Sequence, residues 1–365
     1  MKTRLEPWGA WVRLDSPPAL VGVDHDGARA LGLDGGALWT GAPHTPAPLE
    51  AHVAVTSRCG VGCEGCYLDA KPDGSHVERD ALERTLDDLT ARGVFTVAFG
   101  GGEPILRNDI GELAESARSR GLVPVVTTSG IGMTRDKARA LRAFAQVNVS
   151  YDGAADVYTA VRAFDGAQAA ERAMQLLHEE GVPFGVNVVL TRESFPALSA
   201  TAERARLLGA REAQLLRYKP AGRAARLDYV AKRLSREQVG ELGDVVRRLS
   251  NEMHPKGFRL RIDCALVALL SDALYDRAAD LKALGVFGCE AGAALEAVRS
   301  DGRAAPCSFL EPTDLPLAFG TSEPCHSCAL RDVCRGGCKA VARFVDGRDG
   351  PDPECPRVAR ARGAA

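Results

Sequence analysis

Short apolar runs rich in valine alternate with amphipathic stretches over most of the chain. The runs predict six β-strands, each followed by a stretch with helical periodicity. Strands and helices that alternate in this way form a parallel sheet with right-handed crossovers, either open and doubly wound or curved into a partial barrel. Both arrangements place functional loops at the carboxyl ends of the strands. The predicted strands cover residues 52–56, 95–100, 122–127, 146–151, 183–190 and 212–218.

Helix boundaries are marked by capping residues. Ser75 and Glu78 have the spacing of a capping box, leucines then repeat on one face, and Gly93 follows the last predicted turn. Ser235 and Gln238 repeat the capping-box spacing at the start of a later helix.

The pattern divides the chain into three predicted parts. Residues 1–50 are rich in Gly, Pro and Trp and predict a small β-rich extension, with strand-like runs at 8–14 and 19–23. Residues 51–257 carry the repeating strands and helices. Residues 258–365 begin with a strand and an apolar helix over 264–284, and continue as a tail rich in Cys, Gly and Pro. That tail has too little apolar surface to order itself, so we expect metal to organise it.

Composition restricts the class of protein. A length of 365 residues with 45% hydrophobic content supports a substantial core. The net charge of −2 and the pI near 6.4 give no general attraction to nucleic acid or to anionic membranes. No apolar run reaches the roughly 18 to 20 residues that span a bilayer, and no signal-peptide core follows Met1. The sequence therefore predicts a cytoplasmic protein without nucleic-acid or membrane partners.

Ten of the eleven cysteines fall into two groups. A disulfide framework is one interpretation, but such frameworks belong mainly to small secreted domains. The odd count and the short spacings favour thiolates that bind metal in a reducing compartment. The first group is Cys59, Cys63 and Cys66, and the second is Cys289, Cys307, Cys325, Cys328, Cys334, Cys338 and Cys355.

The first group, with Tyr67 directly after it, lies on the loop that follows the first predicted strand. In this context it resembles the signature of the radical S-adenosylmethionine (SAM) superfamily. The resemblance implies a 4Fe–4S cluster held by three thiolates, whose fourth iron binds the methionine part of SAM. In that superfamily the reduced cluster cleaves SAM, and a 5′-deoxyadenosyl radical removes a substrate hydrogen. A structural zinc site is the alternative, but such sites usually have four ligands and the loop offers no fourth Cys or His. His52 lies upstream and is expected to pack on its strand.

Gly101, Gly102, Glu103 and Pro104 follow the second predicted strand and resemble the GGEP motif of the same superfamily. The resemblance implies that the glycines allow close backbone approach and that polar groups bind the methionine ammonium. In the absence of the cysteines, the motif would indicate only a strand-to-helix turn.

Further candidate cofactor contacts lie at the ends of later strands. Relatives place polar contacts to SAM, including its ribose, where Ser129 and Ser150 stand, although they more often have Asn in place of Ser129. Asn187 and Arg217 also lie late on predicted strands, and each is either a cofactor contact or an ordinary polar rim residue. The segment 219–223 looks similar to the sixth-strand exit of peptide-modifying relatives.

The second group resembles the seven-cysteine SPASM pattern, including Gly302 between its first two cysteines. Relatives with this tail bind two auxiliary iron–sulfur clusters, which implies three 4Fe–4S clusters in all. A zinc knuckle is the alternative for the middle four cysteines. The resemblance assigns Cys289, Cys307 and Cys338 to the nearer cluster, and Cys325, Cys328, Cys334 and Cys355 to the farther one.

This assignment leaves the nearer cluster one ligand short. Relatives fill that place with an additional cysteine or another residue, or leave it open. Cys264 is the only unassigned cysteine, and its position on an apolar helix, 25 residues before Cys289, favours a buried structural residue.

The resemblance covers about residues 51–356 and implies a partial (βα)6 TIM-like barrel with a small C-terminal SPASM domain. It implies an oxidoreductase that abstracts hydrogen from a ribosomally made precursor peptide, leading to crosslinking, epimerisation or oxidative decarboxylation. One alternative is a dehydrogenase or decarboxylase of a small molecule such as a sugar, aminocyclitol or tetrapyrrole. Another is an iron–sulfur electron carrier without catalysis.

Two further features bear on substrate and partners. Sulfatase-maturing relatives have a catalytic aspartate after the second SPASM cysteine, whereas Ser308 follows Cys307 here, which argues against that activity. Only 58 residues precede Cys59, so we expect a separate peptide-recognition protein besides the precursor peptide. Flavodoxin or ferredoxin is the expected reductant.

Overall fold

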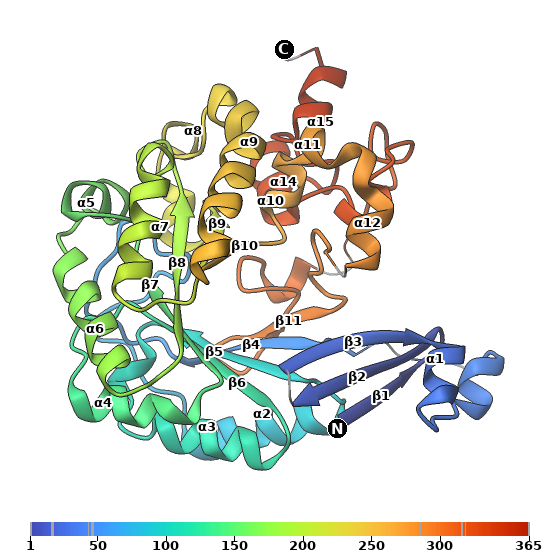
Figure 1. Cartoon of the computed structure of the whole chain (residues 1–365), viewed down its shortest axis with the longest axis horizontal. Coiled ribbons are helices and arrows are strands. Elements are labelled where there is room, and N and C mark those ends of the chain that lie inside the picture. The colour runs from blue at the N-terminus through green and yellow to red at the C-terminus, as the bar shows by residue number, and fades with distance from the viewer. Residues whose placement is uncertain are drawn as a thin grey trace.

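The computed structural model describes residues 2–15, 18–42, 44, 47–284, 286–314, 317 and 319–363. A curved sheet with helices around its outer side forms the centre of the molecule, and a small N-terminal sheet projects from it (Figure 1). The C-terminal residues, drawn in orange and red, lie beside the last strands of the central sheet (Figure 1). The arrangement is the predicted α/β partial barrel with a C-terminal extension.

The central sheet has nine strands in the order β10-β9-β8-β7-β6-β5-β4-β11-β12. Neighbours from β11 through β4 to β10 pair in parallel, and β12 is antiparallel to β11. All six predicted strands are confirmed. The strand predicted at the start of residues 258–365 is also confirmed as β10, and β10 and β11 add one parallel strand at each side. The strands are β4 (Glu50–Thr56), β5 (Thr96–Gly101), β6 (Val123–Thr128), β7 (Gln146–Ser150), β8 (Phe184–Leu190), β9 (Glu212–Arg217), β10 (Arg259–Ile262), β11 (Leu295–Val298) and β12 (Ala304–Ala305).

Helices that follow the strands cover the outer face of the sheet (Figure 1). Alternating strand residues such as Val53 and Val147 are buried against leucines and alanines of these helices, which forms the main core. Residues on the other side of each strand face the interior of the barrel. The helices are α2 (Arg79–Ala91), α3 (Ile110–Ser119), α4 (Arg135–Ala140), α5 (Ala155–Arg162), α6 (Ala167–Glu179), α7 (Leu198–Leu207), α8 (Tyr229–Lys232) and α9 (Arg236–Met253).

One of the two predicted capping boxes is present. Ser235 and Gln238 exchange both hydrogen bonds at the start of α9. The box predicted at Ser75 is wrong, because α2 begins after Glu78, whose side chain makes no capping bond. The reason is that the N–H of Ser75, which a capping box would pair with the Glu78 side chain, instead donates to the hydroxyl of Ser57 at 3.0 Å, in the loop after β4.

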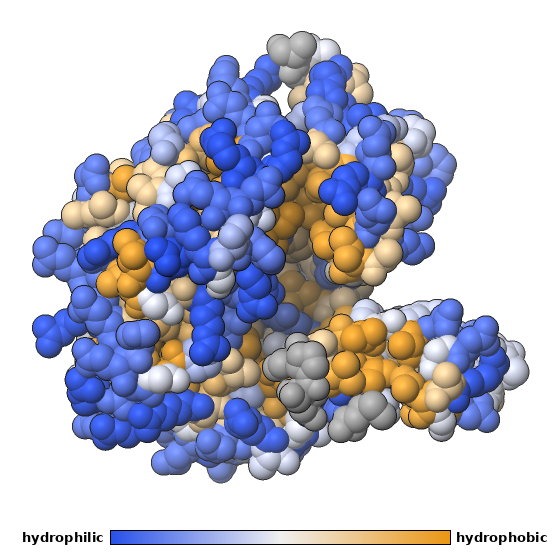
Figure 2. All heavy atoms as spheres, in the orientation of Figure 1, coloured by the Kyte–Doolittle hydropathy of each residue, from blue (hydrophilic) through white to orange (hydrophobic). Residues whose placement is uncertain are grey.

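The N-terminal extension is an antiparallel sheet of β1 (Lys2–Glu6), β2 (Gly9–Asp15) and β3 (Pro18–Asp24), followed by α1 (His25–Ala30). The predicted β character is confirmed, and β1 is an additional strand. Lys2 Nζ donates to the carbonyl of Val94 at 2.7 Å, which anchors the sheet to the barrel. Figure 2 shows that the surface is hollowed between this sheet and the C-terminal region, with apolar side chains on the sheet beside the hollow.

The apolar helix predicted over 264–284 is wrong as a single element. The chain instead forms short turns of helix, which are interrupted at Leu270 and Arg277. Leu266 and Leu269 pack in the barrel core while Val267 and Ala268 pack in a tail cluster, so two different cores hold this segment. Within the described residues, no helix is long and apolar enough to span a membrane. The C-terminal helices are α10 (Leu266–Leu269), α11 (Ser271–Leu274), α12 (Ala278–Ala283), α13 (Arg331–Cys334), α14 (Lys339–Asp346) and α15 (Pro356–Ala361).

Candidate functional site

The loop between β4 and α2 carries Cys59, Cys63 and Cys66 at the carboxyl end of the first barrel strand. The N–H of Cys59 donates to the carbonyl of Lys71 at 2.8 Å, and that of Cys66 to the carbonyl of Cys63 at 3.3 Å. Burial raises the pKa of the Cys59 thiol, and the neighbouring Cys63 and Cys66 add to the effect. The three thiols therefore form one group, and a donor set made only of thiolates suits an iron–sulfur cluster.

Arg223, on the segment after β9, fixes this cysteine loop. Its Nε and Nη2 donate to the carbonyl of Cys63 at 3.1 and 2.8 Å, and its Nη1 donates to the carbonyl of Ala70 at 2.8 Å. The preceding Gly222 has a φ of +55°, and a Cβ there would lie 2.5 Å from the carbonyl oxygen of Tyr67. The segment 219–223 thus positions the cysteine loop, a role that the sequence did not reveal.

Gly101 and Gly102 bring the end of β5 against the same loop. The N–H of Gly102 donates to the carbonyl of Thr56 at 2.8 Å, and the N–H of Glu103 donates to the carbonyl of Arg58 at 2.9 Å. Gly101 has a φ of +113°, and a Cβ on Gly102 would lie 2.2 Å from the carbonyl oxygen of Arg58. The two glycines therefore make the predicted close backbone approach, and the backbone that they approach belongs to the cysteine loop. Pro104 is buried and starts a short 3-10 helix.

Glu103 is 2% exposed and accepts hydrogen bonds at its carboxylate. The donors are Thr128 Oγ1 at 2.6 Å, the backbone N–H and hydroxyl of Ser129 at 2.8 and 2.5 Å, and the backbone N–H of Ile105 at 3.3 Å. Burial raises the pKa of Glu103, and these hydrogen bonds oppose the rise. In the part of the chain that the structure describes, no cation pairs with this acid. A buried carboxylate without a cation fits the ammonium group of a ligand, and Ser129 positions it.

Ser150 and Asn187 lie side by side, because β7 and β8 pair with these two residues in register. Asn187 is 8% exposed, and its Nδ2 lies 3.5 Å from Thr127 Oγ1. Its Oδ1 is buried and has no hydrogen-bond partner among the described residues. A buried acceptor without a donor is unfavourable, so this oxygen fits a hydroxyl or amino group of a bound ligand. The orphaned oxygen is the structural observation that fits SAM.

Tyr67 lies between the cysteine loop and the C-terminal region. Its ring centroid is 4.8 Å from that of Phe309, two positions after Cys307. Burial raises the pKa of Tyr67 to about 12, so the phenol keeps its proton. Tyr67 therefore joins the first cysteine group to the second.

Arg162 is a site residue that the sequence did not indicate. Its Nη1 lies 3.9 Å from Cys63 Sγ, and its Nε donates to Asp152 at 2.6 Å. Burial acts to lower the pKa of Arg162, but the Asp152 carboxylate holds that pKa above its usual value. The guanidinium therefore stays charged beside the thiol. A single arginine at the end of a helix gave no sequence signal.

Arg217 has a different role from the predicted cofactor contact. It is 4% exposed, and its guanidinium donates to both carboxylate oxygens of Asp352 at 2.5 and 3.0 Å and to Glu354 at 2.8 Å. It also donates to the carbonyl of Ala265 at 3.2 Å. These are bonds to the tail and to the segment after β10. Arg217 is therefore a buried link between the barrel and the tail, and not a polar rim residue.

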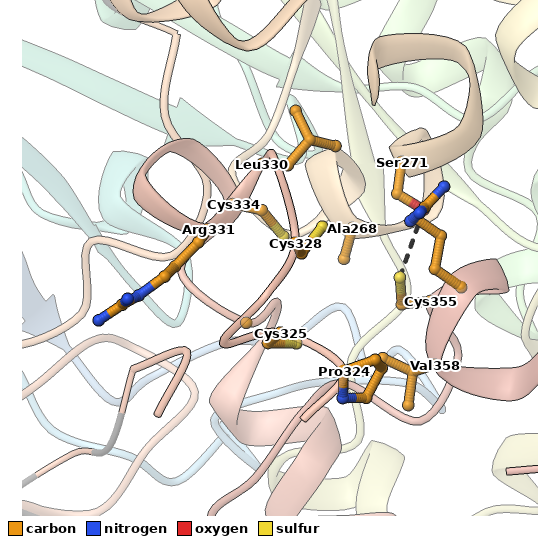
Figure 3. Close-up of a pocket in the computed structure, with 12 residues that line it drawn as sticks. Ala268, Ser271, Pro324, Cys325, Cys328, Leu330, Arg331, Cys334, Cys355 and Val358 are labelled. Carbon is orange, nitrogen blue, oxygen red and sulfur yellow. Dashed lines mark hydrogen bonds between the residues drawn. The ribbon is translucent and has the colours of Figure 1, made fainter. Parts of the chain in front are cut away.

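Four tail cysteines line one cavity, together with apolar residues such as Leu330 and Val358. Figure 3 shows Cys355 on one side of this cavity and the other three cysteines on the loop around the opposite side. The hydroxyl of Ser271 lies 3.3 Å from Cys355 Sγ. An apolar cavity bounded by four thiols fits a 4Fe–4S cluster. The four are Cys325, Cys328, Cys334 and Cys355, the set assigned to the farther cluster.

The other three tail cysteines lie elsewhere, in a second apolar cluster. Cys289 and Cys338 are buried there with Leu310 and Val341, and Cys307 packs against them. The four cysteines that line the cavity belong instead to another apolar cluster, with Val267 and Leu281. The two groups of tail cysteines are thus separate in space, as the interleaved assignment requires.

His52 makes contacts that the sequence did not predict. Its Nδ1 forms a hydrogen bond of 3.0 Å with the hydroxyl of Ser308, and its Nε2 one of 2.9 Å with Glu50. The ring is half-exposed on the interior side of β4. His52 therefore does more than pack on its strand, because it connects β4 to the residue after Cys307.

Comparison with known proteins gives one family match. Residues 53–205 match the model of the Radical SAM superfamily. The range contains the first cysteine group and every candidate cofactor contact except Arg217.

Curated relatives and solved structures extend the match beyond this range. Mycofactocin maturase MftC of Mycolicibacterium smegmatis is 28% identical over 346 residues, which cover 85% of this chain and 83% of the relative. Fe-coproporphyrin III synthase of Methanosarcina barkeri is 30% identical over 212 residues, which cover 56% of this chain and 52% of the relative. The structure of Streptococcus suis SuiB bound to precursor peptide SuiA has the same fold, with a TM-score of 0.74 at 17% identity over 97% of this chain and 98% of that chain.

Proposed function

Because the chain is a radical SAM enzyme related to the SPASM-type peptide maturases, we propose that it modifies a ribosomally made precursor peptide. The observation that carries the proposal is the similarity to mycofactocin maturase, which extends over 85% of this chain. The reaction is hydrogen abstraction that leads to a crosslink, an epimerised centre or an oxidative decarboxylation.

The first cysteine group would bind the cluster, and the polar residues around it would bind SAM. Cys59, Cys63 and Cys66 would hold the cluster. Glu103 would bind the ammonium of SAM, and Asn187 and Ser150 would bind its ribose. Tyr67 lies at the side of the site that faces the tail. When bound, the reduced cluster and SAM supply a 5′-deoxyadenosyl radical. The chain's own contribution is position: Arg223 and the Gly101-Gly102 backbone fix the cysteine loop, and Arg162 keeps a positive charge beside Cys63.

The tail cysteines hold two auxiliary clusters that relay electrons. The apolar cavity around Cys325, Cys328, Cys334 and Cys355 supports the farther cluster, and the separate apolar group around Cys289, Cys307 and Cys338 supports the nearer one. Flavodoxin or ferredoxin is the expected source of electrons.

The partners of this proposal are the precursor peptide and a separate peptide-recognition protein. The N-terminal sheet of the chain is small, with three strands and one short helix. Titration of the isolated chain with a labelled leader peptide tests the need for the second protein. Tight binding by the isolated chain, at a Kd that the recognition protein leaves unchanged, would show that no such partner is required.

A second candidate function is favoured by the similarity to Fe-coproporphyrin III synthase, namely chemistry on a tetrapyrrole. The reconstituted enzyme, SAM and dithionite should therefore be incubated separately with a precursor peptide encoded beside the gene and with a tetrapyrrole precursor of iron coproporphyrin III. The peptide should change in mass as 5′-deoxyadenosine accumulates. Conversion of the tetrapyrrole precursor together with unchanged peptide would reject the peptide proposal in favour of the second candidate.

Two variants separate radical formation from product formation. Cys59→Ala should abolish release of 5′-deoxyadenosine, because the first cluster loses a ligand. Cys325→Ala should keep part of that release and lose product. Full turnover by Cys325→Ala would show that the farther cluster has no part in the reaction.

A further inference from the structure

We propose that Cys264 is the fourth thiolate ligand of the nearer auxiliary cluster, beside Cys289, Cys307 and Cys338. The inference rests on the proposed function, because it requires that the auxiliary clusters form. It assigns a ligand that the seven-cysteine pattern of the tail leaves open.

The structure removes the two sequence arguments against Cys264. This residue does not lie on a helix, because it occupies a turn between β10 and α10. Its distance of 25 positions from Cys289 in sequence is also no obstacle, because the apolar group that contains Cys289 and Cys338 includes Ala265, the neighbour of Cys264.

One neighbour of Cys264 is tied to the segment of Cys307. The carboxylate of Asp263 pairs with the ammonium group of Lys219. The same ammonium lies 4.3 Å from the ring centroid of Phe309, which is two positions after Cys307. These two contacts of Lys219 hold Cys264 near the segment that carries Cys307.

The other neighbour is tied to the segment of Cys338. Arg217 Nη1 donates both to the carbonyl of Ala265 at 3.2 Å and to Asp352 Oδ2 at 2.5 Å. The same Asp352 oxygen accepts the backbone N–H of Cys338 at 2.9 Å. One guanidinium and one carboxylate therefore join the turn of Cys264 to the backbone of a proposed ligand, and all these groups are buried.

The surroundings of the Cys264 thiol agree with this position. Burial is the main cause that raises the pKa of Cys264, and Cys289 and Cys338 lie near enough to contribute. The ammonium of Lys219 acts on the same thiol in the opposite direction. Cys264, Cys289, Cys307 and Cys338 would together form a complete ligand set for a 4Fe–4S cluster, whose iron ions are usually held by four cysteines. A cluster closed in this way relays electrons and offers no iron to the substrate.

The test uses the full-length chain in which Cys59, Cys63 and Cys66 are all changed to Ala, so that only auxiliary clusters bind iron. This background should contain about eight iron ions per chain after anaerobic reconstitution. Adding Cys264→Ala should leave one iron of the nearer cluster without a thiolate, so that mild oxidation releases about one iron per chain and gives the electron paramagnetic resonance (EPR) signal of a 3Fe–4S cluster. Val267→Ala, a truncation of a buried residue on the same segment, should change neither readout.

The outcomes distinguish the assignment of Cys264 as a ligand from the presence of the auxiliary clusters. Unchanged iron content and an unchanged EPR spectrum in Cys264→Ala would overturn the ligand assignment and leave the clusters in place. Absence of iron from the background variant would overturn both the auxiliary clusters and the assignment. If Cys264→Ala fails to fold, Cys264→Ser replaces it: an oxygen ligand should keep the iron and shift the EPR spectrum of the reduced cluster, and an unshifted spectrum would overturn the assignment.

Discussion

His52 Nδ1 lies 3.0 Å from the hydroxyl oxygen of Ser308, although 256 positions separate the two residues in the chain. The contact connects the first barrel strand to the residue after Cys307. His52→Ala should remove one hydrogen bond and lower the free energy of unfolding by about 1 kcal/mol. Because the first cysteine group is untouched, we expect product formation to fall more than release of 5′-deoxyadenosine. The ratio of 5′-deoxyadenosine to product measures this uncoupling.

Glu50→Gln is the matched control for this variant, since an amide can still bind the histidine ring while the charge is lost. It should keep a ratio close to that of the wild type. If His52→Ala and Glu50→Gln give the same ratio as the wild-type enzyme, the contact has no part in coupling the barrel to the tail.

Arg223 positions the cysteine loop by donating to backbone carbonyls, and a lysine cannot make the same set of bonds. Arg223→Lys should therefore lower the occupancy of the first cluster and reduce SAM cleavage by at least about tenfold, as expected for a loss near 1.4 kcal/mol. Iron content and 5′-deoxyadenosine release measure the two effects. Arg226→Lys is the matched control, because Arg226 contacts the same Asp69 yet its side chain is 73% exposed, against 23% for Arg223. Equal losses in both variants would contradict the positioning role.

Gly102 has no room for a side chain, because a Cβ would meet the carbonyl of Arg58. Gly102→Ala should destabilise the chain by about 1–3 kcal/mol and displace the cysteine loop. Gly60→Ala, on that loop in open space, should stay within about 0.5 kcal/mol of the wild type. Urea unfolding and iron content should separate the two. A fully loaded, stable Gly102→Ala protein would show that the loop does not need this close approach.

The sequence predicted the parts of the fold that depend on repeated patterns. Valine-rich runs predicted all six barrel strands, and alternation along them set the buried face. The apolar segment at 264–284 was misread because its composition does not show that it packs into two different cores, one in the barrel and one in the tail. The capping box at Ser75 failed because the N–H of Ser75 donates to the hydroxyl of Ser57 instead.

The site was predictable where chemistry is carried by residue type and spacing. The farther cysteine set lines one cavity, and Gly101 and Gly102 make the expected close approach. The long-range contacts of Arg162, Arg223 and His52 were missed, because arginine and histidine are common on surfaces and the partners in these contacts lie 99 to 256 positions away. Arg217 was named as a candidate cofactor contact but pairs with buried carboxylates instead. A charged residue at a strand end looks the same in sequence in both situations.

Arg217 and Asp352 form a buried pair between the barrel and the tail. Asp352→Ala would leave the guanidinium without its main partner, and removal of one partner from a buried pair typically costs about 3–5 kcal/mol. The exposed pair of Arg360 and Asp272 provides the matched control, and Asp272→Ala should cost about 0–1 kcal/mol. Chemical denaturation of both apoproteins gives the comparison. Similar small losses would show that water or another group compensates Arg217 in the variant.

Glu103 gives a pH dependence whose sign follows from its burial. The pKa of its carboxyl is raised because burial disfavours the charge, although Ser129 and Thr128 oppose this through hydrogen bonds. The folded apoprotein therefore holds this proton more tightly than the unfolded chain. The contribution of Glu103 to stability is fully present below the unfolded pKa of about 4.3 and declines as pH rises toward the folded pKa.

Glu103→Gln cannot lose this proton, so the difference in unfolding free energy between the variant and the wild-type apoprotein should move in favour of the variant as pH rises above about 4.3. The change with pH is the test, since loss of an acceptor for Ser129 adds a constant cost. Glu115→Gln, on the exposed side of α3, controls for the loss of one carboxylate. At neutral pH the same Glu103→Gln variant should bind SAM more weakly, because an amide cannot pair with an ammonium group. Calorimetric titration should show that loss of affinity, and a variant that follows the wild type at every pH and binds SAM equally well would remove Glu103 from the site.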